Sequence, residues 1–407
     1  METYLTALAR QVIQECTFEH DCGYLGQQQR MRVFLPSGDN KYSSFWVRDC
    51  SMTSLSGEMP LEDIRRYVMI IAHNGQNGST PRYLANGLVV PPYAVADHIN
   101  FDGYPVFYPG TYGDGDNQGD GRFGKLPPLD DNSFFVLMAA HYVLTSGDRD
   151  FLVTDINGMT LLSRLERAME AYNVDPKTEL FFATEDMRAV DWGFADAIVK
   201  TGTLLMPSLF RRNAALAMAE LTAGEKAAGY RAIARRIDAS ILHTFWDGSG
   251  WLLSATDIGR QHDVWGTAYA AQAGVLTGQY KRRAQEALVQ AYTSGDAIAH
   301  GYVRHIPVSE NHSPHTAWER SSGPVALGDY QNGAYWSTPT GWYFAALYDN
   351  HKELALQLMQ EFIEHTKTYE AQGAPYEHIN KDTTRFSGSR YGTSAALPLA
   401  GWKQATY

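Results

Sequence analysis

The chain has 407 residues, with 45 acidic and 34 basic side chains and a formal net charge of −11 at pH 7. Apolar residues make up 44% of it and charged residues 19%, an ordinary balance for a globular protein with a large core. The acidic balance argues against nucleic acid or an anionic membrane as a partner, because both require basic surfaces. No apolar run approaches the length of a membrane span.

The three cysteines, Cys16, Cys22 and Cys50, are too few for a disulfide framework and match no zinc-binding spacing. The N-terminus lacks an apolar segment followed by a small-residue cleavage site, so we expect no secretion signal. These features predict a cytoplasmic protein that uses neither a metal nor another cofactor.

Helical periodicity recurs along nearly the whole chain, and strand-like alternation is scarce. We expect twelve helices, near 2–17, 49–57, 61–74, 132–146, 158–173, 203–222, 224–245, 264–277, 280–293, 337–349, 351–370 and 392–403. Their connections alternate between short links and long segments, the long ones being 18–48, 75–131, 174–202, 246–263, 294–336 and 371–391.

Helix composition alternates as well. Helices that follow long segments are small and apolar nearly all round, such as TSAALPLAGW, whereas those after short links are amphipathic and charged, such as YKRRAQEALVQAY. Uniformly apolar helices are buried, and helices with a charged face contact water. The pattern predicts a single all-α domain, residues 1–407, with six inner and six outer helices in an (α/α)6 toroid and all long loops on one face.

The first long segment ends in Trp46, Val47, Arg48 and Asp49. An arginine beside an aspartate at the mouth of an inner helix can hold adjacent sugar hydroxyls through charge-assisted hydrogen bonds. The same pair can instead cap the helix, and the residues alone favour neither role.

The second long segment carries an acidic, glycine-rich stretch, 112–125, that resembles a calcium-binding loop. Gln118 and Lys125 occupy two positions where that loop requires other residues, so a flexible acidic lid is the favoured interpretation. The segment closes in a helix-cap pattern that predicts Asp131 at the mouth of the toroid.

The third long segment supplies a candidate general acid, Asp191, beside Trp192. An adjacent indole desolvates a carboxyl group and raises its pKa, as an acid working near neutrality requires. Glu185, Asp186 and Asp196 remain alternatives for this role.

The next two long segments add candidate substrate-binding residues. His262 is either a proton shuttle or a hydrogen-bonded structural histidine. Amides and indoles gather at the mouth of the following inner helix, a mixture typical of saccharide pockets: Gln331, Asn332, Trp336 and Trp342.

The last long segment places Glu377 beside Tyr376 and among Gly373, Pro375 and Gly388. These residues favour a turn with unusual backbone angles over a helix interior. A lone carboxylate on such a loop, beside an aromatic ring, is suited to acid–base chemistry on a sugar.

Trp46-x-Arg48-Asp49, Asp191-Trp192-Gly193, Gln331-Asn332-Gly333-x-x-Trp336 and the Glu377 segment resemble, in this order, the six-hairpin glycosidases. That group includes glucoamylases, trehalases, processing α-glucosidases, neutral invertases and α-L-rhamnosidases. The resemblance to glucoamylases implies that Arg48 and Asp49 grip the terminal sugar and that Glu377 is the general base. The Asp191 segment is more similar to that of trehalases, processing α-glucosidases or rhamnosidases, which leaves the sugar open.

These observations predict an inverting exo-glycosidase acting on a small carbohydrate, for which we expect an α-linkage, with Asp191 as acid and Glu377 as base. Inversion requires the two carboxyl groups roughly 6.5–9.5 Å apart, with water between them. One alternative is a sugar epimerase of the N-acylglucosamine 2-epimerase type, which would use histidines such as His262, His305 or His378. A saccharide-binding pseudoenzyme and a lyase are the others, although a lyase for acidic polysaccharides should have a basic cleft.

Overall fold

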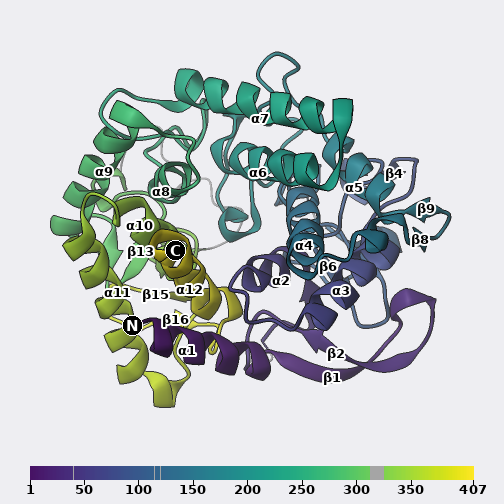
Figure 1. The fold of residues 1–407 in the computed structure, drawn as a ribbon, viewed down its shortest axis with the longest axis horizontal. Coiled ribbons are helices and arrows are strands. Elements are labelled where there is room, and N and C mark those ends of the chain that lie inside the picture. The colour runs from purple at the N-terminus through teal and green to yellow at the C-terminus, as the bar shows by residue number, and fades with distance from the viewer. Residues whose placement is uncertain (40, 114, 120, 312–324) are drawn as a thin grey trace.

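Twelve α-helices organise the part of the chain that the structure describes (Figure 1). The computed structural model describes residues 1–39, 41–113, 115–119, 121–311 and 325–407. The odd-numbered helices are α1 (Glu2–Glu15), α3 (Leu61–Ile70), α5 (Leu161–Glu170), α7 (Gly224–Phe245), α9 (Gly278–Thr293) and α11 (Lys352–Thr368). The even-numbered helices are α2 (Val47–Ser54), α4 (Asp131–Ser146), α6 (Leu205–Leu221), α8 (Val264–Gln272), α10 (Thr340–Leu347) and α12 (Gly392–Thr406). The expectation of twelve helices is confirmed within these ranges.

The even-numbered helices contact one another in a cycle. Helix α2 packs against α4, α4 against α6, α6 against α8, α8 against α10, α10 against α12, and α12 against α2. The odd-numbered helices lie nearer the periphery in Figure 1, and each packs against at least one even-numbered helix.

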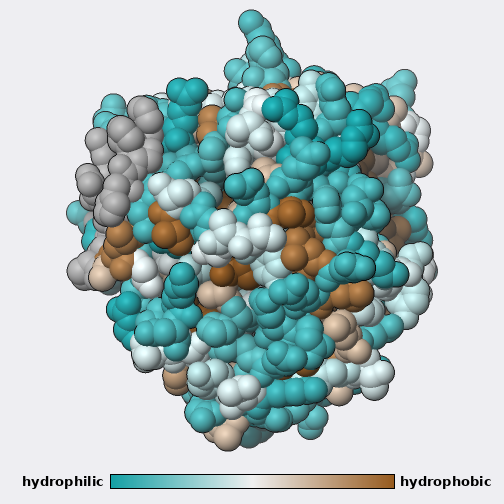
Figure 2. All heavy atoms as spheres, turned by 90° about the vertical axis from the view of Figure 1, so that its left-hand side faces the viewer, coloured by the Kyte–Doolittle hydropathy of each residue, from teal (hydrophilic) through white to brown (hydrophobic). Residues whose placement is uncertain are grey.

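Composition explains this division. Nearly every residue of α10 is buried, and a Cβ on its Gly341 would lie only 2.0 Å from the carbonyl oxygen of Leu397 in α12. Glycine therefore lets α10 and α12 approach closely. Helix α9, in contrast, buries only one stripe that includes Ala284 and Leu288. The face of the molecule on the side of α9 and α11 is mostly hydrophilic (Figure 2).

One cluster of buried hydrophobic residues extends along the chain from Leu5 to Leu399. Within the described ranges, no helix has both the length and the apolarity needed to cross a membrane.

Short strands occur in the connections between helices, where the sequence did not indicate them. The longest pair, β1 (Thr17–Cys22) and β2 (Gln29–Phe34), forms an antiparallel hairpin. Three other pairs join β4 (Arg82–Tyr83) to β5 (Val89–Val90), β8 (Asp155–Ile156) to β9 (Met159–Thr160), and β10 (Phe182–Ala183) to β11 (Gly202–Thr203).

Two small sheets position the residues considered below. One has the order β3 (Ser44–Trp46), β6 (His98–Asn100), β7 (Pro105–Val106). The other has the order β12 (Ile298–Ala299), β13 (Tyr302–Arg304), β14 (Tyr335–Trp336), β15 (His378–Ile379), β16 (Phe386–Ser387). The second sheet joins the last two long connections, because Trp336 pairs with His378 and His378 pairs with Ser387.

Candidate active site

A pocket of about 230 Å³ lies where five of the six long connections meet. Among the described residues, it is lined by three carboxylates and by aromatic rings: Pro36, Tyr42, Trp46, Arg48, Asp49, Gly110, Tyr112, Phe123, Gly193, Phe194, Asp196, Ala197, Val325, Tyr330, Trp336, Glu377 and Tyr391. The 246–263 connection, which is described throughout, contributes no residue to this lining. Rings beside a few convergent carboxylates are the composition expected of a saccharide site.

Glu377 lies in this pocket directly before β15, and its side chain is 2% exposed. Its backbone N–H donates to the carbonyl oxygens of Ser387 and Gly388, both at 2.9 Å. Gly388 has φ of +65°, and a Cβ there would lie 2.6 Å from the Cβ of Glu377. Glycine is therefore required at 388 both for its backbone conformation and for the space that Glu377 occupies.

Two donors from the first long connection hold the Glu377 carboxylate. The Tyr42 hydroxyl donates to Oε1 at 2.7 Å, and the Lys41 ammonium donates to Oε2 at 3.0 Å. Lys41 also donates to the Ser387 hydroxyl at 2.6 Å. The carboxylate is thereby fixed in orientation by residues more than 300 positions away in the sequence.

Asp196 is the carboxylate that the third long connection presents to the pocket. Burial raises the pKa of Asp196 to about 7, and the negative charge of Asp97 adds to this effect. Arg48, a hydrogen bond from Gln331 and one from the Ala197 N–H act in the opposite direction. A carboxyl group with this pKa carries its proton at neutral pH for a substantial part of the time.

Asp191, the acid expected from the sequence, does not line the pocket. It is 2% exposed, and its Oδ2 accepts a hydrogen bond of 2.7 Å from the Lys200 ammonium. Both side chains are almost fully buried, so this ion pair closes the base of the loop 191–200 that carries Asp196. Two other acid candidates, Glu185 and Asp186, are exposed and also lie outside the pocket lining.

Trp192 is fully buried in the core and not on the pocket. Its ring lies 5.6 Å from that of Trp265 and 5.9 Å from that of Trp342, measured between centroids. Trp342 is likewise packed in the core, against Tyr269. Both indoles therefore support the inner helices, and neither contacts the pocket.

Asp49 lines the pocket, and its Oδ1 accepts a hydrogen bond of 2.7 Å from the Tyr391 hydroxyl. Burial raises the pKa of Asp49 to about 7 and Glu377 adds to the shift, while Arg48 and the bond from Tyr391 oppose it. Asp49 is therefore suited to donate or accept a hydrogen bond near neutrality.

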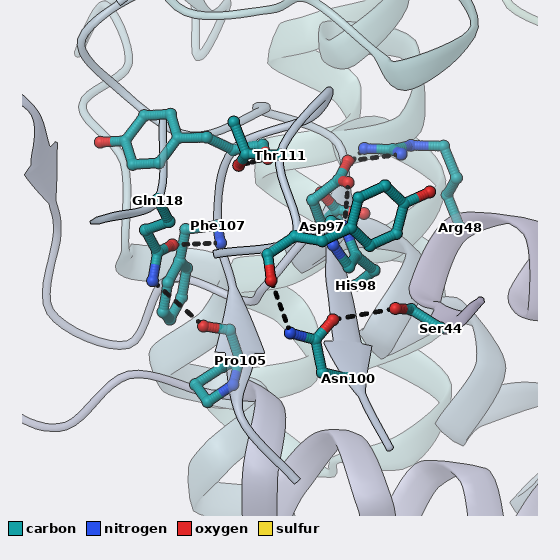
Figure 3. A network of polar contacts seen from close by, with 12 residues as sticks. Ser44, Arg48, Asp97, His98, Asn100, Pro105, Phe107, Thr111 and Gln118 are labelled. Carbon is teal, nitrogen blue, oxygen red and sulfur yellow. Dashed lines mark hydrogen bonds and ion pairs between the residues drawn. The ribbon is translucent and has the colours of Figure 1, made fainter. Parts of the chain in front are cut away.

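Arg48 lines the pocket, and its guanidinium is hydrogen-bonded to three aspartates. It donates to Asp97 at 2.7 Å, to Asp130 at 2.9 Å and to Asp131 at 2.9 Å, and all four side chains are buried. Asp97 in turn accepts a hydrogen bond of 2.8 Å from His98 (Figure 3). Asp131 thus lies beneath the pocket as a partner of Arg48 and does not line it.

Gly193 packs directly against this guanidinium. A Cβ at position 193 would lie 2.1 Å from Arg48 Cζ, and the Gly193 N–H donates to Asp130 at 3.2 Å. The Arg48 cluster therefore supports the loop 191–200, which carries Asp196.

Two expected indoles do reach the pocket, Trp46 and Trp336. Trp46 stacks on His98 with ring centroids 4.3 Å apart, in the sheet formed by β3 and β6. Trp336 belongs to β14, beside the strand that follows Glu377.

Four remaining candidates lie elsewhere. Asn332 donates to the carbonyl oxygen of Val325 at 2.8 Å, and Tyr376 is buried against Phe386 with ring centroids 4.1 Å apart. Gln331 is buried behind the pocket, against the loop 191–200.

The fourth, His262, lines a separate cavity and forms ion pairs with Asp247 at 2.9 Å and with Glu310. Although burial, the largest single influence, lowers the pKa of His262, these two carboxylates together raise it.

In the acidic stretch 112–125 of the second connection, Gln118 is hydrogen-bonded to the backbone of β7 and its neighbour. Its Oε1 accepts a hydrogen bond of 2.6 Å from the Phe107 N–H, and its Nε2 donates to the Pro105 carbonyl at 3.3 Å (Figure 3). The resemblance to a calcium loop depends on Asp114, Asp116 and Gly119, and Asp114 lies outside the described residues. Among the residues that the structure does describe, no group of three or more His, Cys, Asp or Glu side chains is arranged to hold a metal ion.

Sequence reasoning missed several rings that line the pocket: Tyr42, Tyr112, Phe123, Phe194, Tyr330 and Tyr391. Tyr391 carried a usable signal, because it directly precedes the last inner helix, as the Trp336 segment precedes α10. Tyr42 and its neighbour Lys41 carried none, since only the folded chain brings the first connection to Glu377.

No protein-family model and no curated protein matches this sequence. Several solved structures do match. The rhamnosidase from Klebsiella oxytoca with rhamnose bound has a TM-score of 0.60 and 14% identity over 99% of this chain, which spans 63% of that protein. The GH63 mannosylglycerate hydrolase from Thermus thermophilus, in complex with glucose, has a TM-score of 0.58 and 13% identity, with 98% of this chain and 100% of that one covered.

A GH78 rhamnosidase of Bacillus sp. GL1 also matches, with a TM-score of 0.57 and 14% identity over 100% of this chain and 34% of that one. This chain shares the fold of the six-hairpin glycosidases. At these identities the likeness concerns the fold, and the chemistry has to be argued from the pocket.

Proposed function

We propose that this protein is an inverting exo-glycoside hydrolase, built as a single domain on an (α/α)6 toroid. The cycle of contacts among the even-numbered helices supports the toroid. The glycosidase neighbours support the reaction class. A pocket of about 230 Å³ favours a single terminal sugar over an extended chain, and hence exo action.

The observation that carries the proposal is the pairing of Glu377 and Asp196 in one aromatic pocket, from two connections that are distant in sequence. Asp196 would protonate the glycosidic oxygen of the leaving group. Glu377 would take a proton from water as the water attacks the anomeric carbon from the opposite face. The leaving group departs as an alcohol, Asp196 ends ionised, and Glu377 ends protonated.

This proposal moves the acid from Asp191 to Asp196. A general acid must reach the proton acceptor, and Asp196 lines the pocket whereas Asp191 is committed to Lys200 beneath it. The raised pKa of Asp196 suits the same role.

The remaining lining would bind the sugar. Asp49, which Tyr391 orients, would hydrogen-bond sugar hydroxyls, and Trp46 and Trp336 would pack on the apolar face of the ring. Arg48 would act mainly through Asp49 and the acid-bearing loop, because three aspartates occupy its donors.

The epimerase alternative requires histidines in the pocket, and the described lining contains none. His262 lines another cavity, and His305 is buried against Asp263, with 3.1 Å between Nε2 and Oδ2. His378 is buried beside Trp336 with ring centroids 5.3 Å apart. The pocket therefore favours hydrolysis by carboxylates.

A screen of aryl glycosides and disaccharides, followed by variants, tests the proposal. Glu377→Gln and Asp196→Asn should each lower turnover of the best disaccharide by at least about 10²-fold, the usual worth of general acid–base catalysis. Glu185→Gln, an exposed residue of the same connection as Asp196, is the matched control and should stay near wild-type activity. Near-full activity of Glu377→Gln would overturn the proposal, and binding without turnover across the panel would favour a pseudoenzyme.

A further inference from the structure

The Gln331 side chain, which does not line the pocket, forms two hydrogen bonds with the loop that carries Asp196. Its Oε1 accepts a hydrogen bond of 2.6 Å from the Ala197 N–H. Its Nε2 donates to the Gly193 carbonyl oxygen at 3.0 Å. These two bonds flank Asp196 on both sides, and Gln331 also hydrogen-bonds the Asp196 side chain.

This arrangement needs both the oxygen and the nitrogen of the Gln331 amide, each in its present position. The Ala197 N–H needs an acceptor, and the Gly193 carbonyl needs a donor. Asparagine would be one methylene shorter, and a carboxylate would lose the donor. The contact therefore depends on the specific chemistry of glutamine at this position.

Gln331 lies in a tight turn that backbone hydrogen bonds close. Its neighbour Tyr330 has φ of +42°, a conformation uncommon for a residue with a side chain. The turn is closed by hydrogen bonds from the Asn332 N–H to Asp329 at 2.9 Å and from the Ala334 N–H to Tyr330 at 3.0 Å. Such backbone strain persists only where surrounding contacts fix it, and it often marks functional sites.

We propose that Gln331 is a positioning residue that holds the general acid Asp196 in register with the leaving-group oxygen. This inference rests on the proposed function, and it assigns to Gln331 a role different from contact with the sugar. Because general acid catalysis depends on the geometry of proton transfer, small displacements of Asp196 should slow reactions that need protonation.

The test compares two substrates that share a sugar. A natural disaccharide has a poor leaving group and needs the acid, whereas the matching nitrophenyl glycoside needs it far less. Gln331→Leu should lower kcat on the disaccharide at least about 10-fold, part of the 10²–10⁴-fold worth of an acid. Its kcat on the nitrophenyl glycoside should change by less than about 3-fold, well below that range.

The pH profile supplies a second readout. The Gln331 hydrogen bond favours ionised Asp196, so its removal should raise the pKa of Asp196 further and move the basic limb of the kcat/KM profile to higher pH. Gln331→Met, which keeps the length of the side chain but has neither the donor nor the acceptor, should show the same selectivity and serves if Gln331→Leu fails to fold.

Gln285→Leu is the matched control. Gln285 is also fully buried, donates to the carbonyl oxygen of Ala346 at 2.7 Å and to the Asp349 carboxylate at 2.6 Å, and is not part of the pocket lining. Gln285→Leu should lower the stability of the protein without changing the ratio of kcat on the disaccharide to kcat on the nitrophenyl glycoside.

The proposal is overturned if Gln331→Leu slows both substrates by the same factor and leaves the basic limb in place while Asp196→Asn is selective. If Asp196→Asn also slows both substrates equally, the acid assignment itself is wrong and the role of Gln331 falls with it.

Discussion

Breaking the buried ion pair between Asp191 and Lys200 should destabilise the protein and reveal which aspartate is the acid. The Lys200 ammonium lies 2.7 Å from Asp191 Oδ2, and the two side chains are 2% and 1% exposed. Removal of one partner leaves a buried charge without its counter-ion, which costs roughly 3–5 kcal/mol. We expect Lys200→Met and Asp191→Asn each to lose a free energy of unfolding in this range.

The double variant Asp191→Asn/Lys200→Met removes both charges, so it should be less destabilised than the sum of the two single variants by at least about 2 kcal/mol. Urea unfolding followed by tryptophan fluorescence measures these values, because Trp192 adjoins Asp191 in the core. Additive losses would show that the pair is not energetically coupled.

Activity of the folded variants completes the test. If Asp191 only closes the loop 191–200, the activity lost in Asp191→Asn should depend less on the leaving group of the substrate than the activity lost in Asp196→Asn. A fully stable Asp191→Asn that loses activity only on poor leaving groups would refute the reasoning and restore Asp191 as the acid.

Two further predictions concern Gly193 and Asp49. Gly193→Ala should destabilise the protein by more than the roughly 1–3 kcal/mol typical of overpacking, because its Cβ would lie 2.1 Å from Arg48 Cζ. The control is Gly229→Ala in α7, where an added Cβ would have no atom within 4 Å. In thermal unfolding, this control should be neutral or stabilising. Thermal stability should also fall as the pH rises from about 4 to about 7, because folding raises the pKa of Asp49 from about 3.9 to about 7 and the folded state binds that proton more tightly. Asp49→Asn, which cannot ionise, should reduce this slope and leave the part that Asp196 contributes, because the pKa of Asp196 is also raised to about 7. An unchanged slope would contradict the raised pKa of Asp49.

The helices were accessible from the sequence because their signal is local. Alternating composition distinguished amphipathic segments such as α9 from uniformly apolar ones such as α10. Two-residue strands such as β14 and β15 gave no period-two pattern, because so few residues cannot show alternation. The six-residue strands β1 and β2 were long enough to show it, and were missed within an expected loop.

The site was only partly accessible. Glu377, Asp49, Trp46 and Trp336 were expected at the pocket and line it. The sequence could not show that Asp196 lines the pocket and Asp191 does not, because both belong to one loop and the Lys200 ion pair that buries Asp191 depends on the folded backbone. Trp192, the indole that favoured Asp191 as the acid, faces the core.

Gln331 illustrates the same limit. Amide side chains at an inner-helix mouth suggested contact with sugar, but the two bonds to the loop around Asp196 depend on the meeting of connections more than 130 residues apart. The residue type indicated that Gln331 lies near the site, and the proposed positioning role depends on the geometry of its two hydrogen bonds.

The stereochemistry of the product tests the central claim most directly. With a glycoside substrate of known anomeric configuration, proton NMR during the first turnovers distinguishes the anomer released by the enzyme from the one formed later by mutarotation. Asp196 as acid and Glu377 as base predict a first-formed sugar of inverted configuration. A first-formed sugar of retained configuration would contradict the account, because it requires a covalent intermediate on one of the carboxylates instead of direct attack by water.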